Sequence, residues 1–211
     1  MYCSKCECEF VGWTGKCPTD GTLLVEPSPV PNRAAHPPVP YETLVDRIRE
    51  NNGSIEIELH ATEVGRERKM SFPFRGYGFA WTKKMTGQIN GIAVDLHIDD
   101  IGKNTDRGFP YQGYGFAWEQ QMRGWVDGHD IALTATKVAH EKKHLFPYRG
   151  LGYSWAEELT GVCGNSIRGE MRTTEIGRDK TWTFFCYFGF GYAWISRATL
   201  VLTLVNRQSG E

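Results

Sequence analysis

Phe72-Pro-Phe-Arg-Gly-Tyr-Gly-Phe-Ala-Trp81 is the stretch of sequence that decides the fold, because it occurs four times with small changes. The other copies end at Trp118, Trp155 and Trp194, so the tryptophans are 37, 37 and 39 residues apart. A fixed spacing of this kind indicates one supersecondary unit that is repeated. The four units are predicted at about 55–91, 92–128, 129–166 and 167–205.

An alternating pattern precedes each aromatic stretch. Ile55, Ile57 and Leu59 alternate with polar residues, and the same alternation follows from Ile92 to Ile98. Period two is typical of a strand with one buried face. Each unit is therefore predicted to be a hairpin: an alternating strand, a charged turn, an aromatic strand, and a turn that contains glycine in three of the units.

Four hairpins in series predict a mainly β fold, an eight-stranded antiparallel meander over residues 55–205. Eight strands can close into a barrel whose interior side chains fill the space. A β-sandwich is the alternative form. A propeller is disfavoured, because about 37 residues supply two strands here and a blade needs four.

The first 26 residues predict a small metal-binding unit. Cys3, Cys6, Cys17 and Asp20 have the paired spacing of a structural zinc site, in which two short turns each present two ligands. Cys8 is the alternative fourth ligand. Zinc is the expected cofactor, and a ribbon of this size would owe most of its folding free energy to the metal.

The run Cys3-Ser-Lys-Cys6, the stretch Trp13-Thr-Gly-Lys-Cys-Pro18 and Leu23-Leu24 resemble the rubredoxin-like zinc ribbon of the bacterial repair ATPase RadA. The resemblance covers residues 3–24 only. That family implies a cysteine as the fourth ligand, where this chain has Asp20. It implies no ATPase activity here, because the chain contains no phosphate-binding loop motif.

Residues 27–40 contain six prolines and are predicted to form an extended linker. An amphipathic helix is expected at 41–53, with Leu44 and Ile48 on its apolar side and Gly53 at its end. It is expected to pack across an open end of the β domain. Residues 206–211 form a tail.

Composition indicates a cytoplasmic protein. The net charge of −1 predicts no general affinity for nucleic acid or acidic membranes, and no apolar run is long enough to cross a bilayer. Four of the six cysteines lie in the first 17 residues, which favours a metal site in a reducing compartment over disulfides.

Two surfaces are candidate binding sites. The first is an aromatic face on the second strand of each hairpin: Tyr77, Trp81, Tyr114, Trp118, Tyr153, Trp155, Tyr192 and Trp194. The second is a basic rim around the hairpin turns: Arg66, Arg68, Lys69, Arg75, Lys103, Arg107, Lys142, Lys143, Arg149, Arg178 and Lys180.

The function predicted from these features is a non-catalytic binding or assembly module, which presents its aromatic surface to a protein partner or to another copy of itself. Single-stranded nucleic acid or another anionic ligand at the basic rim is the alternative. A small-ligand carrier or an enzyme with a site in the barrel mouth is the second alternative. No catalytic motif singles out a residue.

Overall fold

A computed structural model describes residues 39–71, 75–108, 112–145, 149–182 and 189–205. The chain divides into two units, Met1–Pro37 and Pro38–Glu211, and all described residues belong to the second. The predicted zinc ribbon, the linker up to residue 38 and the tail lie outside the described residues. Within the described part, no helix is long and apolar enough to cross a membrane.

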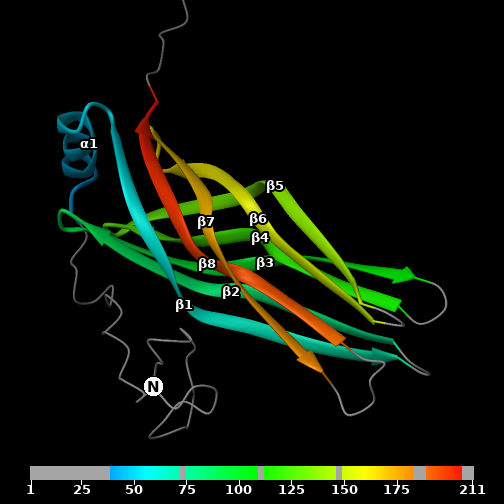
Figure 1. The fold of residues 1–211 in the computed structure, drawn as a ribbon. Helices are drawn as coiled ribbons and strands as arrows, with labels where there is room; N and C mark the ends of the chain where they lie inside the picture. The colour runs from blue at the N-terminus through cyan, green and yellow to red at the C-terminus, as the bar shows by residue number, and fades with distance from the viewer. Residues whose placement is uncertain (1–38, 72–74, 109–111, 146–148, 183–188, 206–211) are drawn as a thin grey trace, which may run out of the picture. The chain divides into compact units, whose positions relative to one another are not determined.

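The β domain is a closed antiparallel barrel in which each strand pairs with the next along the chain and β8 returns to β1 (Figure 1). The predicted meander is confirmed, and of its two expected forms the barrel is the correct one. One helix and eight strands make up the domain: α1 Tyr41–Glu50, β1 Ser54–Ser71, β2 Arg75–Ile89, β3 Ile92–Gly108, β4 Gln112–Val126, β5 His129–Leu145, β6 Arg149–Cys163, β7 Ile167–Trp182 and β8 Gly189–Leu204.

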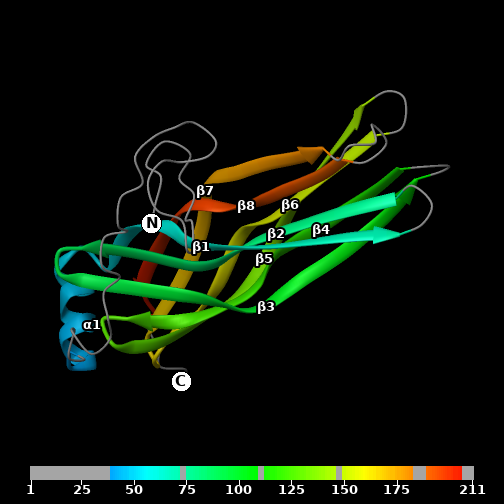
Figure 2. The same ribbon diagram turned by 90° about the horizontal axis from the view of Figure 1, so that it is seen from below.

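The barrel has a closed half and an outer half. Within each hairpin the strands pair along nearly their full length, from His60 opposite Thr86 to Ser71 opposite Arg75 in the first. Between hairpins the ladders are short; β2 and β3 pair only from Lys84 to Ile89. Beyond these ladders the four hairpins continue as separate two-stranded ribbons, away from the end that carries α1 (Figure 2).

A pair of register shifts marks the boundary between the two halves in every hairpin. In the first hairpin the shifts lie between Ala61 and Val64, and equivalent shifts occur in β3, β5 and β7. Bulges bend a strand and increase its twist. They therefore let each ribbon leave the cylinder of the closed half.

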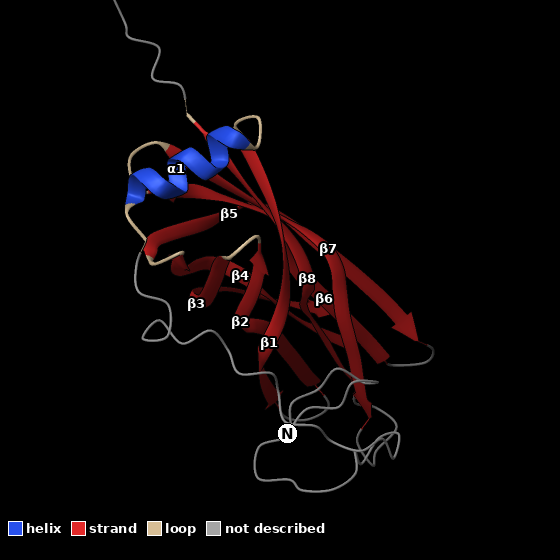
Figure 3. Ribbon diagram, turned by 90° about the vertical axis from the view of Figure 1, so that its left-hand side faces the viewer, coloured by secondary structure: helices blue, strands red, loops and turns tan. Residues whose placement is uncertain are grey.

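Helix α1 covers the end of the closed half (Figure 3). Leu44 and Ile48 are fully buried in the same apolar cluster as Ile57 and Leu59 of β1. The helix ends where the N–H of Gly53, at φ +82°, donates to the carbonyl of Ile48. Polar contacts also fix it: Arg47 forms an ion pair with Asp127 at 3.1 Å, and Tyr41 hydrogen-bonds the carbonyl of Cys163 at 3.0 Å.

Close backbone packing joins the hairpins in the outer half. A Cβ added at Gly115 of β4 would lie 2.6 Å from the carbonyl oxygen of Gly78 in β2, and one at Gly191 of β8 would lie 2.8 Å from that of Gly152 in β6. Glycine removes the side chain that would hold these strands apart. The same glycine faces receive aromatic rings, since Tyr77 lies over Gly113 and Phe190 lies over Gly76.

The four second strands therefore pack in a ring. Each of β2, β4, β6 and β8 lays its glycine face against the apolar side chains of the second strand of the preceding hairpin, with β2 lying on β8. In the described part of each aromatic stretch, both faces of the strand are consequently buried as far as the residue before the tryptophan. Glycine on one face of each strand lets the neighbouring strand approach, and the aromatic side chains on the other face cover the glycine face of the next strand.

Gly115→Ala is predicted to lower the free energy of unfolding by about 1–3 kcal/mol, because the new methyl group meets backbone that cannot move alone. Denaturant unfolding measures the change. Gly169→Ala is the matched control, because there the nearest atoms are the side-chain ends of Ile131 and Leu133. Equal losses in the two variants would contradict the proposed role of the glycine faces.

Candidate functional site in the outer half of the barrel

Four ion pairs join the first strands of neighbouring hairpins around the outer half. Each cation is paired with a carboxylate on the preceding hairpin around the ring: Arg66 with Asp179 at 3.0 Å, Lys103 with Glu67 at 2.5 Å, Lys142 with Asp106, and Arg178 with Glu141 at 2.8 Å. These contacts connect β1 to β7, β3 to β1, β5 to β3 and β7 to β5. They form a closed ring, which is called the interhairpin belt below.

Each belt cation also lies over aromatic rings of the neighbouring hairpin. Lys103 Nζ is 5.5 Å from the ring centre of Phe79 and 5.1 Å from that of Trp81. The other three cations lie within about 6 Å of ring centres in the same way: Arg66 over Tyr192 and Trp194, Lys142 over Tyr114 and Phe116, and Arg178 over Tyr153 and Trp155. A cation from one hairpin thus contacts both strands of another.

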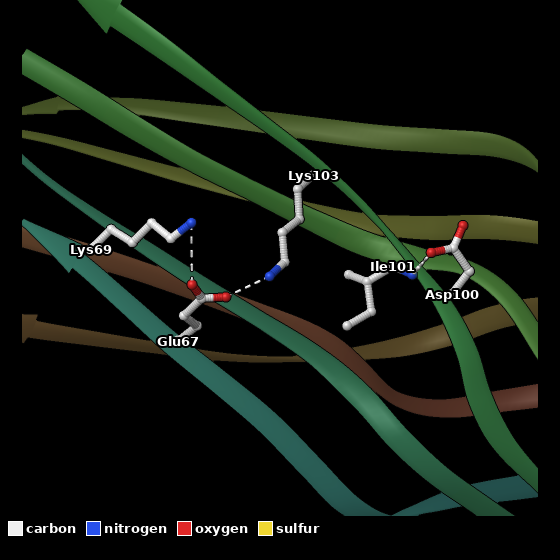
Figure 4. Close-up of polar contacts among 5 residues, drawn as sticks. All are labelled: Glu67, Lys69, Asp100, Ile101 and Lys103. Atoms are coloured by element: carbon white, nitrogen blue, oxygen red, sulfur yellow. Dashed lines mark hydrogen bonds and ion pairs between the residues drawn. The ribbon is translucent and has the colours of Figure 1, made fainter.

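Glu67 shows how the belt affects a single carboxylate (Figure 4). Its oxygens accept from Lys103 and lie 3.4 Å from Lys69. The hydrogen bond from Lys103 is the main reason that the pKa of Glu67 lies below its usual value. Ionised Glu67 therefore stabilises the folded state above its ordinary pKa, and this contribution is lost as the pH falls.

The seam between the second and third hairpins has a different composition. His140 stands where the other hairpins have the belt cation, and Asn104 stands where they have the belt carboxylate. The ion pair forms instead two residues further along each strand, between Lys142 and Asp106. Two residues along a strand return to the same face. His140 instead contacts the edges of Phe116 and Trp118, at ring distances of 5.4 and 5.7 Å.

Glu119 lies at the centre of the domain, where the ladders between hairpins stop. It follows Trp118, and the residues in the same place of the other hairpins are Thr82, Ala156 and Ile195, all fully buried. Its carboxylate accepts from the backbone N–H of Thr82 at 2.6 Å and from that of Ala156 at 3.4 Å. Thr82 donates its hydroxyl to the carbonyl of Ile195 at 2.7 Å.

These three hydrogen bonds connect β4 to β2 and β6, and β2 to β8. Burial removes water from the carboxyl group, which raises the pKa of Glu119 despite the two N–H donors. Glu119 is thus a buried link between strands.

In the part of the chain that the structure describes, no group of three or more histidine, cysteine or acidic residues is placed to hold a metal ion.

The candidate aromatic residues are placed mostly inside. The four tyrosines Tyr77, Tyr114, Tyr153 and Tyr192 are at most 6% exposed, and burial raises the pKa of the last three. The four tryptophans are half-buried. Three indoles lie on the glycine opposite them, Gly65, Gly102 and Gly177, and the fourth stands opposite Ala139. Of these eight candidate residues, the tryptophans alone leave part of an aromatic ring near the surface.

The candidate basic residues fall into three groups. Arg66, Lys103, Lys142 and Arg178 form the belt, so they hold hairpins together. Lys69 and Lys143 pair with carboxylates of their own strands, Arg68 lies 5.4 Å from the ring of Phe190, and Lys180 is exposed. The side chains of Arg75, Arg107 and Arg149 lie outside the described residues, as do Cys3, Cys6, Cys8, Cys17 and Asp20.

Cys163 is a structural thiol at the other end of the barrel. It is fully buried beside α1, and burial raises its pKa to about 11. A thiol that stays protonated at neutral pH is a poor nucleophile and a poor metal ligand. Cys163 therefore adds no chemistry to the site.

Comparisons with protein families, curated proteins and solved structures find no match to this chain. Function is therefore argued from the site alone.

Sequence reasoning missed the four belt carboxylates as partners, and it missed Glu119. Both had a signal in the repeats. Asn104 and His140 depart from the repeat together, while Asp106 and Lys142 supply the missing charges two residues later. Glu119 is a charge at a position where the other copies have Thr82, Ala156 and Ile195.

Lys103→Met is predicted to cost about 0.5–1.5 kcal/mol of stability, because it removes an ion pair and a cation–π contact that join two hairpins. A double-mutant cycle with Glu67→Gln measures the coupling. The acid-sensitive contribution of Glu67 should shrink in the Lys103→Met background. Lys137→Met is the control, since its pair with Glu157 lies within one hairpin. Zero coupling between Lys103 and Glu67 would show that the belt does not stabilise the fold.

Glu119→Gln is predicted to change how stability depends on pH. The folded state holds the proton of Glu119 more tightly than the unfolded chain, so its stabilising effect is full at low pH and is lost as the pH rises through the raised pKa. The glutamine variant stays neutral and should lack this decline. Denaturant unfolding between about pH 4 and 9 measures it, with half-exposed Glu157→Gln as the control. Parallel pH profiles for wild type and Glu119→Gln would refute it.

Proposed function

We propose that residues 39–205 form a non-catalytic binding or assembly module that contacts a protein partner through the outer half of the barrel. The observation that supports this most is how the interior uses its polar groups. Glu119 and Thr82 hold strands to one another inside the barrel, as the belt residues do on its outside. These polar groups therefore serve the fold and not a chemical task of their own.

The outer half offers the side chains that a partner can reach. Arg68, Lys69, Lys143 and Lys180 are exposed there, and the half-buried tryptophans lie a few residues closer to the closed half. Arginine and aromatic residues are enriched in protein interfaces.

The two alternatives rank lower. Single-stranded nucleic acid is supported by the exposed cations, but of the eight candidate aromatic residues the tyrosines are buried and the tryptophans are half-buried, which leaves little ring surface for stacking bases. A ligand or substrate in the barrel mouth is disfavoured at the α1 end, where Leu44 and Ile48 fill the opening.

A photo-crosslinking amino acid at Lys180 is predicted to give protein adducts in the cells that make this chain. Arg172 is the matched control position, because it is also exposed and lies on the same strand, but in the closed half. The readout is the position dependence of adducts on a denaturing gel, with the partner identified by mass spectrometry. Equal adduct yields at both positions, or none at either, would disprove the proposed function.

We also propose that residues 1–26 hold one structural zinc ion through Cys3, Cys6 and Cys17, with Asp20 or Cys8 as the fourth ligand. The purified chain should contain one zinc per molecule by elemental analysis, and Cys17→Ser should lose it. Separate Asp20→Ala and Cys8→Ser variants decide the fourth ligand. Cys163→Ser is the control that should keep the metal. A metal-free wild type would rule the site out.

A further inference from the structure

Basic and acidic side chains are separated along the β domain. The outer segments, residues 66–80, 103–117, 140–154 and 178–193, contain eleven basic and four acidic residues, a net charge of +7 with histidine neutral. The rest of residues 41–205 contains nine basic and sixteen acidic residues, a net charge of −7. The domain is neutral as a whole, so the net charge of −1 for the full chain conceals an uneven distribution of charge within the domain.

The positive outer segments lie at one end of the domain, and the negative charge is spread over α1 and the closed half. Helix α1 and the start of β1 mark one end, and the paired ends of β1 and β2 mark the other (Figure 1). At the α1 end Glu42, Glu50 and Glu56 are exposed and form no ion pair with another described residue. At the outer end the exposed cations include Arg68 and Lys180, which also form no ion pair within the described chain.

We propose that the outer end of the barrel binds the acidic α1 end of a second copy of this chain. This inference depends on the proposed function and names its partner. The basic outer end and the exposed carboxylates at the α1 end have opposite sign, and such complementarity speeds association and selects the partner. Carboxylates also suit this site better than stacked bases, because the four tyrosines are buried and only part of each tryptophan is exposed.

The contact joins different surfaces, so it is head-to-tail. A head-to-tail contact leaves one free end of each kind, and chains of molecules grow unless the rotation closes a ring. Exposed ion pairs are weak one by one and are screened by salt beyond about 8 Å at physiological ionic strength. Association is therefore expected to be reversible, strongest at low salt and dependent on protein concentration.

Sedimentation velocity on the full chain tests this inference. The weight-average mass should rise with concentration at ~20 mM salt and return to that of the monomer at about 500 mM. Charge reversal at either end, by Arg68→Glu with Lys180→Glu or by Glu50→Lys with Glu56→Lys, should reduce association at least tenfold. An equimolar mixture of the two variants should restore it, because each supplies the charge that the other lacks.

The control variant carries Lys137→Glu with Arg172→Glu. It changes the net charge by the same amount as the first variant, at two side chains that are each 63% exposed on the closed half, between the two ends. It should keep at least half of the wild-type association constant. Association lost equally in the control would overturn the inference, because only net charge would then matter.

Three other results would overturn it. A wild type that is monomeric at every salt concentration, together with capture of a different protein by the crosslinker at Lys180, leaves the proposed function standing without self-association. A monomeric wild type that also gives no position-dependent adducts would refute both self-association and the proposed function. Salt-sensitive binding of a single-stranded oligonucleotide by a monomeric wild type, lost in Arg68→Glu with Lys180→Glu, assigns the outer end to nucleic acid instead.

Discussion

The contact of backbone with backbone at the glycine faces of β2, β4, β6 and β8 is the constraint on which the outer half depends. A two-stranded ribbon is marginally stable alone in water. The four ribbons continue well past the last ladder between hairpins, so they must bury their faces against each other. Without side chains at Gly78 and Gly115, each second strand approaches its neighbour closely enough for aromatic rings to cover the small face.

This packing creates a need for polar contacts that a complete barrel would not have. Where neighbouring hairpins share no ladder, the edges of their strands need other partners and other links. The interhairpin belt supplies them on the outside, through one ion pair and its aromatic contacts at each of four seams. Glu119 and Thr82 supply them on the inside, by hydrogen bonds that reach three other strands.

The same arrangement separates charge along the barrel. The four ion pairs of the belt use cations and carboxylates in equal number. The outer segments contain eleven basic and four acidic residues, which is a surplus of seven cations. Two of the surplus cations, Arg68 and Lys180, have no carboxylate partner among the described residues. We therefore propose the binding role for this positive end, and the α1 end with Glu42, Glu50 and Glu56 carries the opposite sign.

The sequence alone determined the number of hairpins, their antiparallel order and the buried face of β1, because hydrophobic period and repeat length are properties of the chain itself. It also indicated the short helix, through the spacing of Leu44 and Ile48. Tertiary structure alone decided that the sheet closes, that both faces of the aromatic strands are buried, and that Lys103 meets Glu67 rather than solvent. The reason is that these outcomes depend on which hairpins are neighbours and on the distance between them. Lys103 and Glu67 are 36 positions apart in the sequence, and no local sequence pattern indicates that they meet.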